Sequence, residues 1–446
     1  MSEPEEKRGG PQVLARAEHT ISRAAMSPNA LKVLYRLHGA GFLAYLVGGA
    51  VRDLLLGRRP KDFDIGTNAR PQQVRQLFRN ARVIGRRFRL VMVRFASEVV
   101  EVATFRRSPE PPEIEEGETA DVLAPTPDVD EYGTPEEDAW RRDFTVNALF
   151  YNIADFSVID HVGGLADLDA GVIRTVGPPR LRFAEDPVRM MRAVEYAARL
   201  GFRLEDELAD ATASMHPEIR RAAPARIAYE LLESLKGGSA LRIFRGLEDA
   251  SLLGHIVPEA HAATVSGNGA VLWSLLASAD ERYRKDERVG EETLLALLFL
   301  PQFLAALQKA GERLPPAGDI ERLAREQLEP AMLRLAISHY RGHVVRSSLL
   351  LLTRMMAPAK SGKHVLRTVR HEAFSTAWQV MHLLAEVDGR YRSALAAWEH
   401  PVSQALAGRA PAVEATKLGR EEAARGRRRG RRGGRRHNRP KPAGAP

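Results

Sequence analysis

The chain has no cysteine among its 446 residues, so it forms neither disulfide bonds nor thiolate metal sites and has no cysteine nucleophile. It also lacks any apolar run near the roughly 20 residues that a membrane span requires, and its first residues, MSEPEEKRGGPQ, are polar. No His-Asp doublet occurs, which argues against an appended metal phosphohydrolase domain of the His-Asp type. These absences lead us to expect a cytoplasmic protein without membrane contact.

The chain has almost no net charge outside its C-terminal end. From Arg425 to Lys441 there are nine arginines, one lysine and no acid, and subtracting these ten charges from the overall +9 leaves −1 for the rest. This Gly-, Arg- and Pro-rich tail cannot bury apolar surface, so we expect residues 416–446 to be disordered and to attract RNA phosphate without sequence preference. The arginines expected to bind RNA are Arg427, Arg428, Arg429, Arg431, Arg432, Arg435 and Arg436.

Length and local patterns predict two or three domains, the first of them mixed α/β. A hydrophobic content of 44% over 446 residues exceeds one ordinary core. Alternation and periodicity predict strands at 43–47, 91–95 and 99–105 and helices at 30–39 and 71–78. The second helix should start at Pro71 after a cap at Asn68. Two short strands around a turn at Gly163 and Gly164 are expected between residues 155 and 176, and the remainder is helical by period.

The most informative pattern is a pair of acids, Asp62 and Asp64, that follows a glycine pair, Gly48 and Gly49. In an extended strand, residues at i and i+2 project from the same face, so the two carboxylates would lie side by side and can bind Mg²⁺. The glycines follow a short apolar strand and lead into a helix, a geometry that lets backbone N–H groups approach phosphate oxygens. Phosphate on one side and a metal ion on the other predict nucleotide chemistry.

The run LVGGAVRDLLLGRRPKDFD, from Leu46 to Asp64, resembles the active-site motif of the tRNA nucleotidyltransferase and bacterial poly(A) polymerase family, the class II nucleotidyltransferases. Five further blocks resemble the family in the same order, within a resemblance that runs from about Ala30 to about Leu253. They are GRRFRL at 85–90, EVATFR at 101–106, RRDFTVNAL at 141–149, DHVGGLADL at 160–168 and EDPVRMMRA at 185–193. The resemblance implies nucleotidyl transfer from ATP to an RNA 3′ end, assisted by two Mg²⁺ ions.

The resemblance also implies an architecture. We expect an α/β nucleotidyltransferase head, with a mixed sheet of the DNA polymerase β palm type, followed by an all-α neck, body and tail. The expected ranges are a mobile N-terminal extension at 1–29, the head at 30–178 with a mobile, lid-like loop at 107–139, the neck with the base-binding motif at 179–253, an RNA-binding body and tail at 254–415, and the disordered tail at 416–446.

Acids are expected to hold the metal ions. Asp62 and Asp64 are the expected bridging ligands, because hard oxygen atoms suit Mg²⁺ and two such ions can activate the 3′-hydroxyl and stabilise the leaving group. A third acid should assist them. The resemblance favours Asp143 for this role, ahead of Glu101, which lies in a predicted strand with apolar neighbours on its face.

Arginines and polar neighbours are expected to hold the nucleotide. Arg52 and Arg142 should contact the triphosphate, because a guanidinium bonds two phosphate oxygens at once and stays charged. Gly48 and Gly49 would approach the same phosphates through their backbone. Asn147 would support the ribose.

The base of the incoming nucleotide is expected at the start of a helix. Asp186, Arg189 and Arg192 are spaced three apart, so we expect them on one helix face, where carboxylate and guanidinium groups would read a base edge as a protein template. Farther along, basic residues such as Arg226 either follow an RNA backbone or face solvent.

Three functions fit the sequence. The GRRFRL block, the N-terminal extension and the arginine tail favour poly(A) addition to mRNA. This reaction promotes RNA turnover, so the RNA-decay machinery is a candidate partner. A CCA-adding tRNA nucleotidyltransferase shares every block, and Met92 stands where the polymerase pattern has histidine. The third is a non-catalytic RNA-binding protein, which the intact acids oppose because a decayed site tends to lose carboxylates that repel one another.

Overall fold

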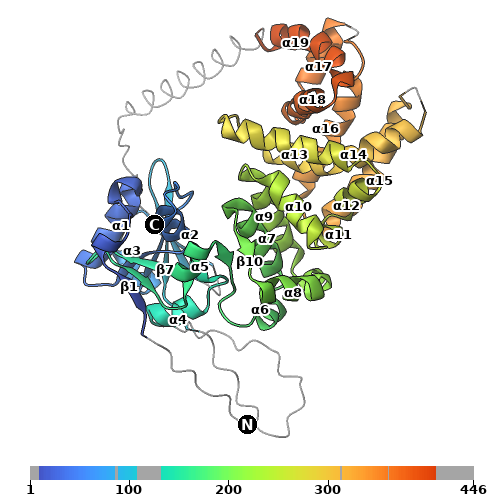
Figure 1. Cartoon of the computed structure of the whole chain (residues 1–446). Coiled ribbons are helices and arrows are strands. Elements are labelled where there is room, and N and C mark those ends of the chain that lie inside the picture. The colour runs from blue at the N-terminus through green and yellow to red at the C-terminus, as the bar shows by residue number, and fades with distance from the viewer. Residues whose placement is uncertain (1–9, 86–88, 108–131, 312–313, 360, 408–446) are drawn as a thin grey trace, which may run out of the picture. The chain divides into compact units, whose positions relative to one another are not determined.

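A computed structural model describes residues 10–85, 89–107, 132–311, 314–359 and 361–407 and divides the chain into two compact units. The first unit is Met1–His261 and the second is Ala262–Pro446. Figure 1 shows a sheet and helices in the first unit and helices, coloured yellow to red, in the second. Within the described ranges, no helix is long and apolar enough to cross a membrane.

The head is built on a mixed sheet with the strand order β1-β8-β7-β2-β3-β6-β5-β4. Only β3 and β6 pair in parallel among these neighbours. The strands are β1 Gln12–Leu14, β2 Ala44–Val47, β3 Asp64–Thr67, β4 Ala81–Ile84, β5 Leu90–Arg94, β6 Val99–Thr104, β7 Leu149–Asn152 and β8 Val158–Asp160. The strands predicted near residues 43, 91 and 99 are confirmed as β2, β5 and β6. The central strand β7 was not predicted.

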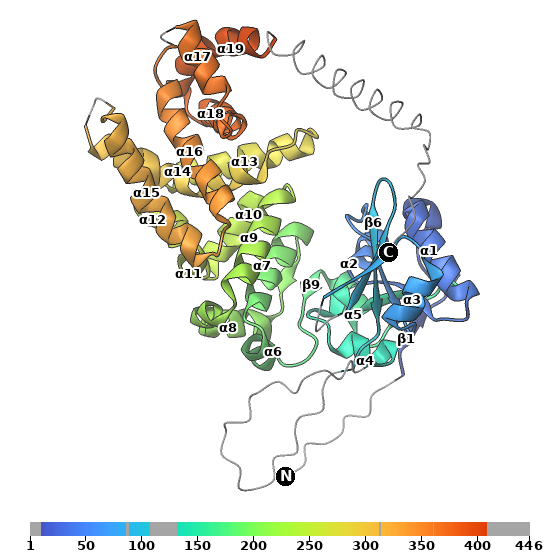
Figure 2. The ribbon, with the colours of Figure 1, turned by 180° about the vertical axis from the view of Figure 1, so that it is seen from behind.

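Helices cover one face of this sheet, as Figure 2 shows for α1 and α3. They are α1 Pro28–Gly39, α2 Gly49–Leu55 and α3 Pro71–Leu77. Pro28 occupies the first turn of α1, and the Ser27 hydroxyl accepts hydrogen bonds from the N–H groups of Asn29 and Ala30. The opposite face carries a smaller aromatic cluster of Tyr45, Phe105 and Phe150 beside α4 Pro135–Trp140.

The N-terminal and loop predictions need correction. Residues 10–29 are not a free extension, because β1 pairs with β8 at the sheet edge and Ile21 and Met26 are buried in the head core. The predicted cap at Asn68 is wrong: its side chain accepts from the Leu43 N–H, and Arg70 precedes α3. Residues 108–131 of the predicted loop lie outside the described residues.

Two other local predictions were only partly right. The loop was predicted to reach residue 139, but α4 begins at Pro135, after Thr134 and Glu137 exchange hydrogen bonds as a capping box. The two short strands predicted between residues 155 and 176 are present as β8 Val158–Asp160 and β9 Val172–Ile173, but they belong to different sheets. Gly163 and Gly164 lead into α5 Gly164–Ala170, and Gly164 packs so closely that a Cβ there would lie 2.2 Å from the Thr145 carbonyl oxygen.

Helices follow the sheet within the first unit, and α7 packs against α9 and α10. A short parallel pair, β9 Val172–Ile173 and β10 Arg203–Leu204, joins them to the head. The helices are α6 Pro179–Glu185, α7 Val188–Leu200, α8 Asp206–Met215, α9 Pro224–Lys236, α10 Ala240–Asp249, α11 Leu253–Ile256 and α12 Pro258–Val265. The first unit ends at His261, within α12, and α11 packs on α10; the predicted end of the neck at 253 stays a prediction.

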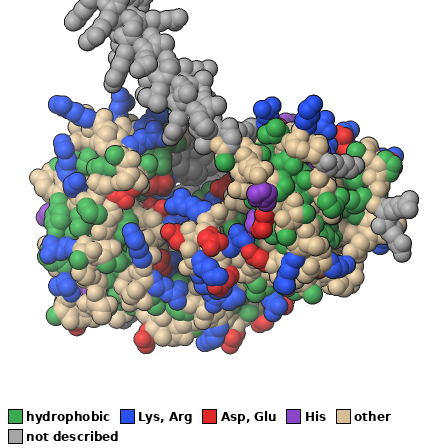
Figure 3. Space-filling view, turned by 90° about the horizontal axis from the view of Figure 1, so that it is seen from above, with side chains coloured by type: hydrophobic (Ala, Val, Ile, Leu, Met, Phe, Trp, Pro, Cys, Tyr) green, Lys and Arg blue, Asp and Glu red, His purple; other side chains and the backbone are tan. Residues whose placement is uncertain are grey.

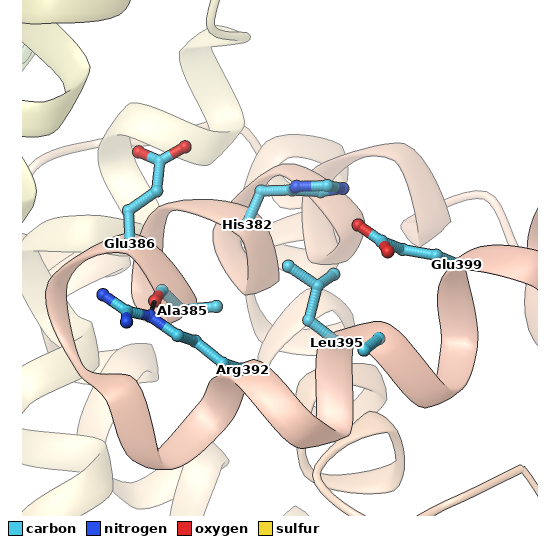
Figure 4. Close-up of a pocket in the computed structure, with 7 residues that line it drawn as sticks. His382, Ala385, Glu386, Arg392, Leu395 and Glu399 are labelled. Atoms are coloured by element: carbon cyan, nitrogen blue, oxygen red, sulfur yellow. Dashed lines mark hydrogen bonds between the residues drawn. The ribbon is translucent and has the colours of Figure 1, made fainter.

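The second unit is helical wherever the structure describes it. Its helices are α13 Gly269–Arg284, α14 Glu291–Lys309, α15 Ala317–Arg334, α16 His339–Met355, α17 Gly362–Val369, α18 Phe374–Val387 and α19 Arg392–Ala407. Nearly every residue of α14 from Thr293 to Leu304 is buried, so this helix forms the centre of the unit. Helices α18 and α19 border a pocket of about 350 Å³ lined by His382, Glu386, Arg392 and Glu399 (Figure 4).

Short 3-10 turns complete the fold. They are Arg16–Glu18, Arg23–Ala25, Thr145–Asn147, His216–Arg221 and Gly389–Tyr391. The turn at Thr145–Asn147 has the most direct bearing on the predicted site, because it connects α4 to the central strand β7 and carries Asn147.

Candidate active site

Asp62, Asp64 and Glu101, which we call the carboxylate cluster, lie on or just before two neighbouring strands. Asp64 begins β3, Glu101 lies in β6, and Asp62 comes just before β3. The two strands are parallel, and Ile65 pairs with Val102. Asp64 and Glu101 therefore stand one position earlier, at the same level and on the same face of the sheet.

The negative charges of the carboxylate cluster repel one another. Desolvation by the surrounding protein, followed by the charges of Glu101 and Asp62, raises the pKa of Asp64 to about 6, although Arg142 acts in the opposite direction. Burial and the charge of Asp62 also raise the pKa of Glu101. Asp62 and Asp64 are nevertheless exposed to solvent, so a cation from solution can reach them.

Two glycines allow the backbone around the cluster to pack closely. Gly48 has φ 71° where β2 turns into α2, and a Cβ there would lie 2.9 Å from Arg142 Nη1. A Cβ on Gly66 would lie 2.5 Å from Phe105 Cε1. The predicted strand, glycine turn and helix are thus confirmed, and Val47, the last residue of β2, pairs with Asp64.

Asp143 does not join the carboxylate cluster. Its Oδ2 accepts from Arg192 Nε at 2.8 Å and lies 2.6 Å from Nη2, while its Oδ1 accepts from the Phe144 N–H at 2.8 Å and from Asn147 Nδ2 at 3.3 Å. Burial opposes ionisation, but the charge of Arg192 and these hydrogen bonds hold the pKa of Asp143 below its ordinary value. The structure therefore groups Glu101, not the favoured Asp143, with Asp62 and Asp64.

Arg192 of α7 links Asp143, which precedes the turn before β7, to α9. Besides Asp143, it donates to Glu230 Oε1 of α9 at 3.1 Å and to the Tyr196 hydroxyl at 2.9 Å. The pKa of Arg192 is raised, chiefly by the charge of Asp143. We call Asp143, Arg192, Glu230, Asn147 and Tyr196 the Asp143 network. The Arg192 guanidinium is thus bound to Asp143, Glu230 and Tyr196, and its role in reading the incoming base stays a prediction.

Arg52 is likewise held inside the protein. It is 1% exposed; Nε donates to Asp53 Oδ1 at 2.8 Å, Nη1 donates to Asn147 Oδ1, and the guanidinium lies 5.3 Å from the Tyr196 ring centroid. Asn147 is 6% exposed and is used by both Arg52 and Asp143. The structure therefore turns Arg52 and Asn147 toward one another rather than toward an open triphosphate or ribose site.

Arg142 is the predicted phosphate-binding arginine that faces the carboxylate cluster. Its Nη1 donates to the Asn147 carbonyl at 3.1 Å and its Nη2 to Asp138 of α4 at 3.0 Å. Its Nε is buried without a hydrogen-bond partner among the described residues. Its Nη1 also lies beside Gly48, which follows Val47, the β2 partner of Asp64, and the charge of Arg142 lowers the pKa of Asp64.

Asp186 and Arg189 lie where α6 gives way to α7, not on one helix face as predicted. Asp186 ends α6 with extended backbone, and both of its oxygens accept from Arg226 of α9 at 2.8 Å. Arg189, in the first turn of α7, donates to Glu185 at 2.7 Å and to the Arg182 carbonyl at 2.8 Å. Arg226 was not assigned to this site from the sequence, because the 40 residues that separate it from Asp186 leave no local signal.

Several predicted residues cannot be placed. The RNA-binding arginines Arg427, Arg428, Arg429, Arg431, Arg432, Arg435 and Arg436 lie outside the described residues, as do positions 86–88 of the GRRFRL block. Over the described surface seen in Figure 3, acidic and basic side chains are interspersed, which agrees with the near-neutral charge of the chain without its tail.

The carboxylate cluster fits a divalent metal ion by its donor chemistry. Among the described residues, no three His, Asp or Glu side chains are already arranged to hold a metal. A pair of carboxylates is nonetheless a common protein contribution to a Mg²⁺ site, since the substrate phosphates and water provide the remaining oxygens. Desolvation and the negative charges of Glu101 and Asp62 raise the pKa of Asp64, and a bound cation would favour its ionised form.

Comparison with known proteins agrees with this geometry. Residues 44–174 match the poly A polymerase head domain, and residues 201–264 match a probable RNA and SrmB-binding site of polymerase A. Poly(A) polymerase I of Salmonella typhi is 41% identical over 387 residues, which cover 84% of this chain and 82% of that protein. A CCA-adding enzyme of Bacillus pumilus is 38% identical over 224 residues, which cover 50% of this chain and 54% of that enzyme.

A solved structure supports the fold. The crystal structure of the Bacillus stearothermophilus CCA-adding enzyme in complex with CTP matches with a TM-score of 0.60 and 26% identity, covering 86% of this chain and 83% of that chain. The head domain match spans the carboxylate cluster and Asp143, and the second match contains Arg226 and Glu230. From the site geometry and the extent of these similarities, the chain belongs to the poly(A) polymerase family of nucleotidyltransferases.

Proposed function

We propose that this chain is a template-independent polynucleotide adenylyltransferase that adds AMP from ATP to RNA 3′ ends. The 3′-oxygen of the RNA forms a bond to the α-phosphorus of ATP, the bond from that phosphorus to the bridging oxygen breaks, and pyrophosphate leaves. The observation that carries the choice is the extent of sequence similarity: the 41% identity to poly(A) polymerase I of Salmonella typhi extends over 84% of the chain, whereas the 38% identity to the Bacillus pumilus CCA-adding enzyme extends over 50%. The CCA-adding enzyme structure that covers 86% of the chain is 26% identical to it. The reaction would take place in the cytoplasm.

The carboxylate cluster would hold two Mg²⁺ ions through Asp62 and Asp64. Bound there, the ions would lower the pKa of the 3′-hydroxyl and stabilise the departing pyrophosphate. Glu101, on the same sheet face as Asp64, adds negative charge that favours cations. Asp64 must be ionised to act as a ligand. Because its pKa is raised to about 6, a large fraction of Asp64 is protonated in mildly acidic solution without a metal ion.

The nucleotide would lie between the cluster and the start of α7. Arg142 faces the phosphates, and Gly48 lets the backbone beside it approach them. Asp186 and Arg189 would read the adenine edge, which requires Arg226 to release at least one oxygen of Asp186. Arg52, Asn147 and the Asp143 network would hold these groups in position. The arginine tail would add attraction to RNA phosphate that weakens as salt rises.

One assay tests the proposal against its alternatives. Purified protein with Mg²⁺, ATP alone and a labelled RNA of generic 3′ sequence should produce long extension products. A CCA-adding enzyme would instead add a limited number of nucleotides to a truncated tRNA and would consume CTP. A non-catalytic RNA-binding protein would shift the RNA in a gel but leave its length unchanged, and either of these outcomes would refute adenylyl transfer to generic RNA.

A further inference from the structure

The solvent face of α9 links the expected base site to the carboxylate cluster. Arg226, Tyr229 and Glu233 are spaced at i, i+3 and i+7, so they follow one side of the helix. At one end Arg226 binds Asp186, with two bonds of 2.8 Å. At the other end Glu233 binds Lys61 at 2.8 Å, and Lys61 directly precedes Asp62. Tyr229 stands between these two anchored ends.

Tyr229 presents an aromatic ring to solvent at this place. It is 62% exposed, although most of the other residues from Ala228 to Leu235 on the same helix are buried. Among the described residues it has no hydrogen-bond partner and no ring to stack on. Desolvation and the charges of Glu233 and Glu230 raise the pKa of its hydroxyl, with Lys61 and Lys236 acting against them. Glu233, one turn farther along α9, ties this part of the helix to Lys61, which directly precedes Asp62.

The charges around the ring suit a nucleic-acid strand. Lys61 and Lys236 both pair with Glu233, at 2.8 and 2.5 Å. The Lys61 side chain is still 70% exposed, so its ammonium group can also contact a phosphate of an RNA strand. The helix also lies within residues 201–264, which match a probable RNA-binding site.

We propose that Tyr229 is the stacking platform for the base of the RNA's 3′-terminal nucleotide. This proposal rests on the proposed function, because the 3′-oxygen must reach Asp62 and Asp64 while the incoming base is read at Asp186. The terminal nucleotide then lies along α9 between Asp186 and Lys61, where Tyr229 is found. Stacking on an aromatic ring tolerates every base, which suits an enzyme that accepts varied RNA ends.

Steady-state extension of a short RNA by the full chain tests the platform. Tyr229→Ala should raise the KM for RNA about 10-fold, from a stacking contribution of roughly 1–3 kcal/mol per base, and leave the KM for ATP within about two-fold. Tyr229→Phe and Tyr229→Trp keep a ring and should behave like the native chain. Tyr35→Ala, which removes a half-exposed tyrosine of α1, is the control for loss of a surface ring.

The contrary results are distinct. An unchanged KM for RNA in Tyr229→Ala would overturn the proposal, and a raised KM for ATP alone would place the incoming adenine on the ring instead. If Tyr229→Phe were as impaired as Tyr229→Ala, the hydroxyl and not the ring would matter, and the proposal would again be wrong.

A second measurement does not depend on catalysis. An RNA carrying 2-aminopurine as its 3′-terminal base should lose fluorescence on binding the native chain, because stacking quenches this base. Tyr229→Ala should bind the RNA without that quenching, whereas Tyr229→Phe should retain it. If the native chain fails to extend RNA but quenches the probe through Tyr229, the proposed function fails while the platform stands; equal quenching in Tyr229→Ala would eliminate the platform itself.

Discussion

Two groups of acids in the first unit differ in how their charge is balanced. In the carboxylate cluster, desolvation and the charges of the neighbouring acids Glu101 and Asp62 raise the pKa of Asp64 to about 6. In the Asp143 network, Asp143 is bonded to Arg192, Asn147 and a backbone N–H, and its pKa is lowered. A bound cation would stabilise the ionised acids of the first group. In the second group, Arg192 already neutralises the acid and links it to neighbouring elements.

The comparison assigns the carboxylate cluster to the proposed reaction and the Asp143 network to holding neighbouring elements in position. A set of acids that repel one another is costly to fold, so its presence on the open face of a sheet points to a ligand that neutralises it. An acid whose charge is matched by a nearby arginine needs no ligand, but its loss leaves a partly buried guanidinium without its partner. Asp143 therefore connects the turn before β7 to α7 and, through Arg192, to α9, whereas Asp62, Asp64 and Glu101 are the acids that we propose act in the reaction.

The largest effect is expected from removing both metal-binding acids. Asp62→Ala combined with Asp64→Ala should slow RNA extension by on the order of 10³-fold or more, because the loss of the ligands removes several kcal/mol of transition-state stabilisation. Extension of a labelled RNA under single-turnover conditions measures the rate, and thermal unfolding shows whether the variant is folded. Continued extension at the native rate would remove the basis for distinguishing the two groups of acids.

The next effect should appear in stability rather than chemistry. Asp143→Ala should lower the free energy of unfolding by about 2 kcal/mol, somewhat less than for a completely buried ion pair, because Arg192 retains Glu230. Urea unfolding followed by circular dichroism measures the change. Glu101→Gln is the matched control, since it removes an acid whose pKa is raised and should not destabilise the fold. Equal destabilisation by the two variants would contradict the comparison.

Substitution of Asp186 tests whether an acid that is paired with Arg226 can also read a base. Asp186→Asn should reduce the preference for ATP over CTP by about 10-fold, because one oxygen acceptor becomes a donor. The ratio of kcat/KM for the two nucleotides is the measurement, and Arg226→Ala serves as the companion variant that frees Asp186 without changing it. Unchanged ATP preference in Asp186→Asn would show that its pair with Arg226 is purely structural.

The smallest effect concerns the cost of the charge on Asp64. Its pKa is raised from 3.8 to about 6 on folding, so the folded state holds this proton more tightly and its stability should fall as pH rises from about 4 to about 6. Asp64→Asn should remove this fall and stabilise the metal-free protein at pH 7 by about 1 kcal/mol, a value reduced for solvent exposure. Thermal unfolding in EDTA at several pH values measures both. A destabilised variant would mean that the Asp64 charge is already compensated.

Local sequence patterns were sufficient for much of the fold. Strands β2, β5 and β6, helices α1 and α3, and the glycine turn at Gly48 follow from alternation, periodicity and backbone freedom. The Thr134 and Glu137 spacing is also typical of a capping box, but the Pro- and acid-rich composition of the preceding residues led us to extend the predicted loop over α4. Asn68 was misassigned as a cap because its side chain bonds to the N–H of Leu43, just before β2, a partner that no local pattern indicates.

The sequence by itself determined that Asp62 and Asp64 stand together beside a strand, a glycine turn and a helix, because those relations span few residues. Only the tertiary structure decided that Glu101 joins them and Asp143 does not. The parallel pairing of β3 with β6 brings Glu101 to the level of Asp64, and the packing of α7 and α9 brings Arg192 and Glu230 to Asp143. The physical reason is that charges far apart in sequence acquire their partners, and hence their roles, only when strands pair and helices pack.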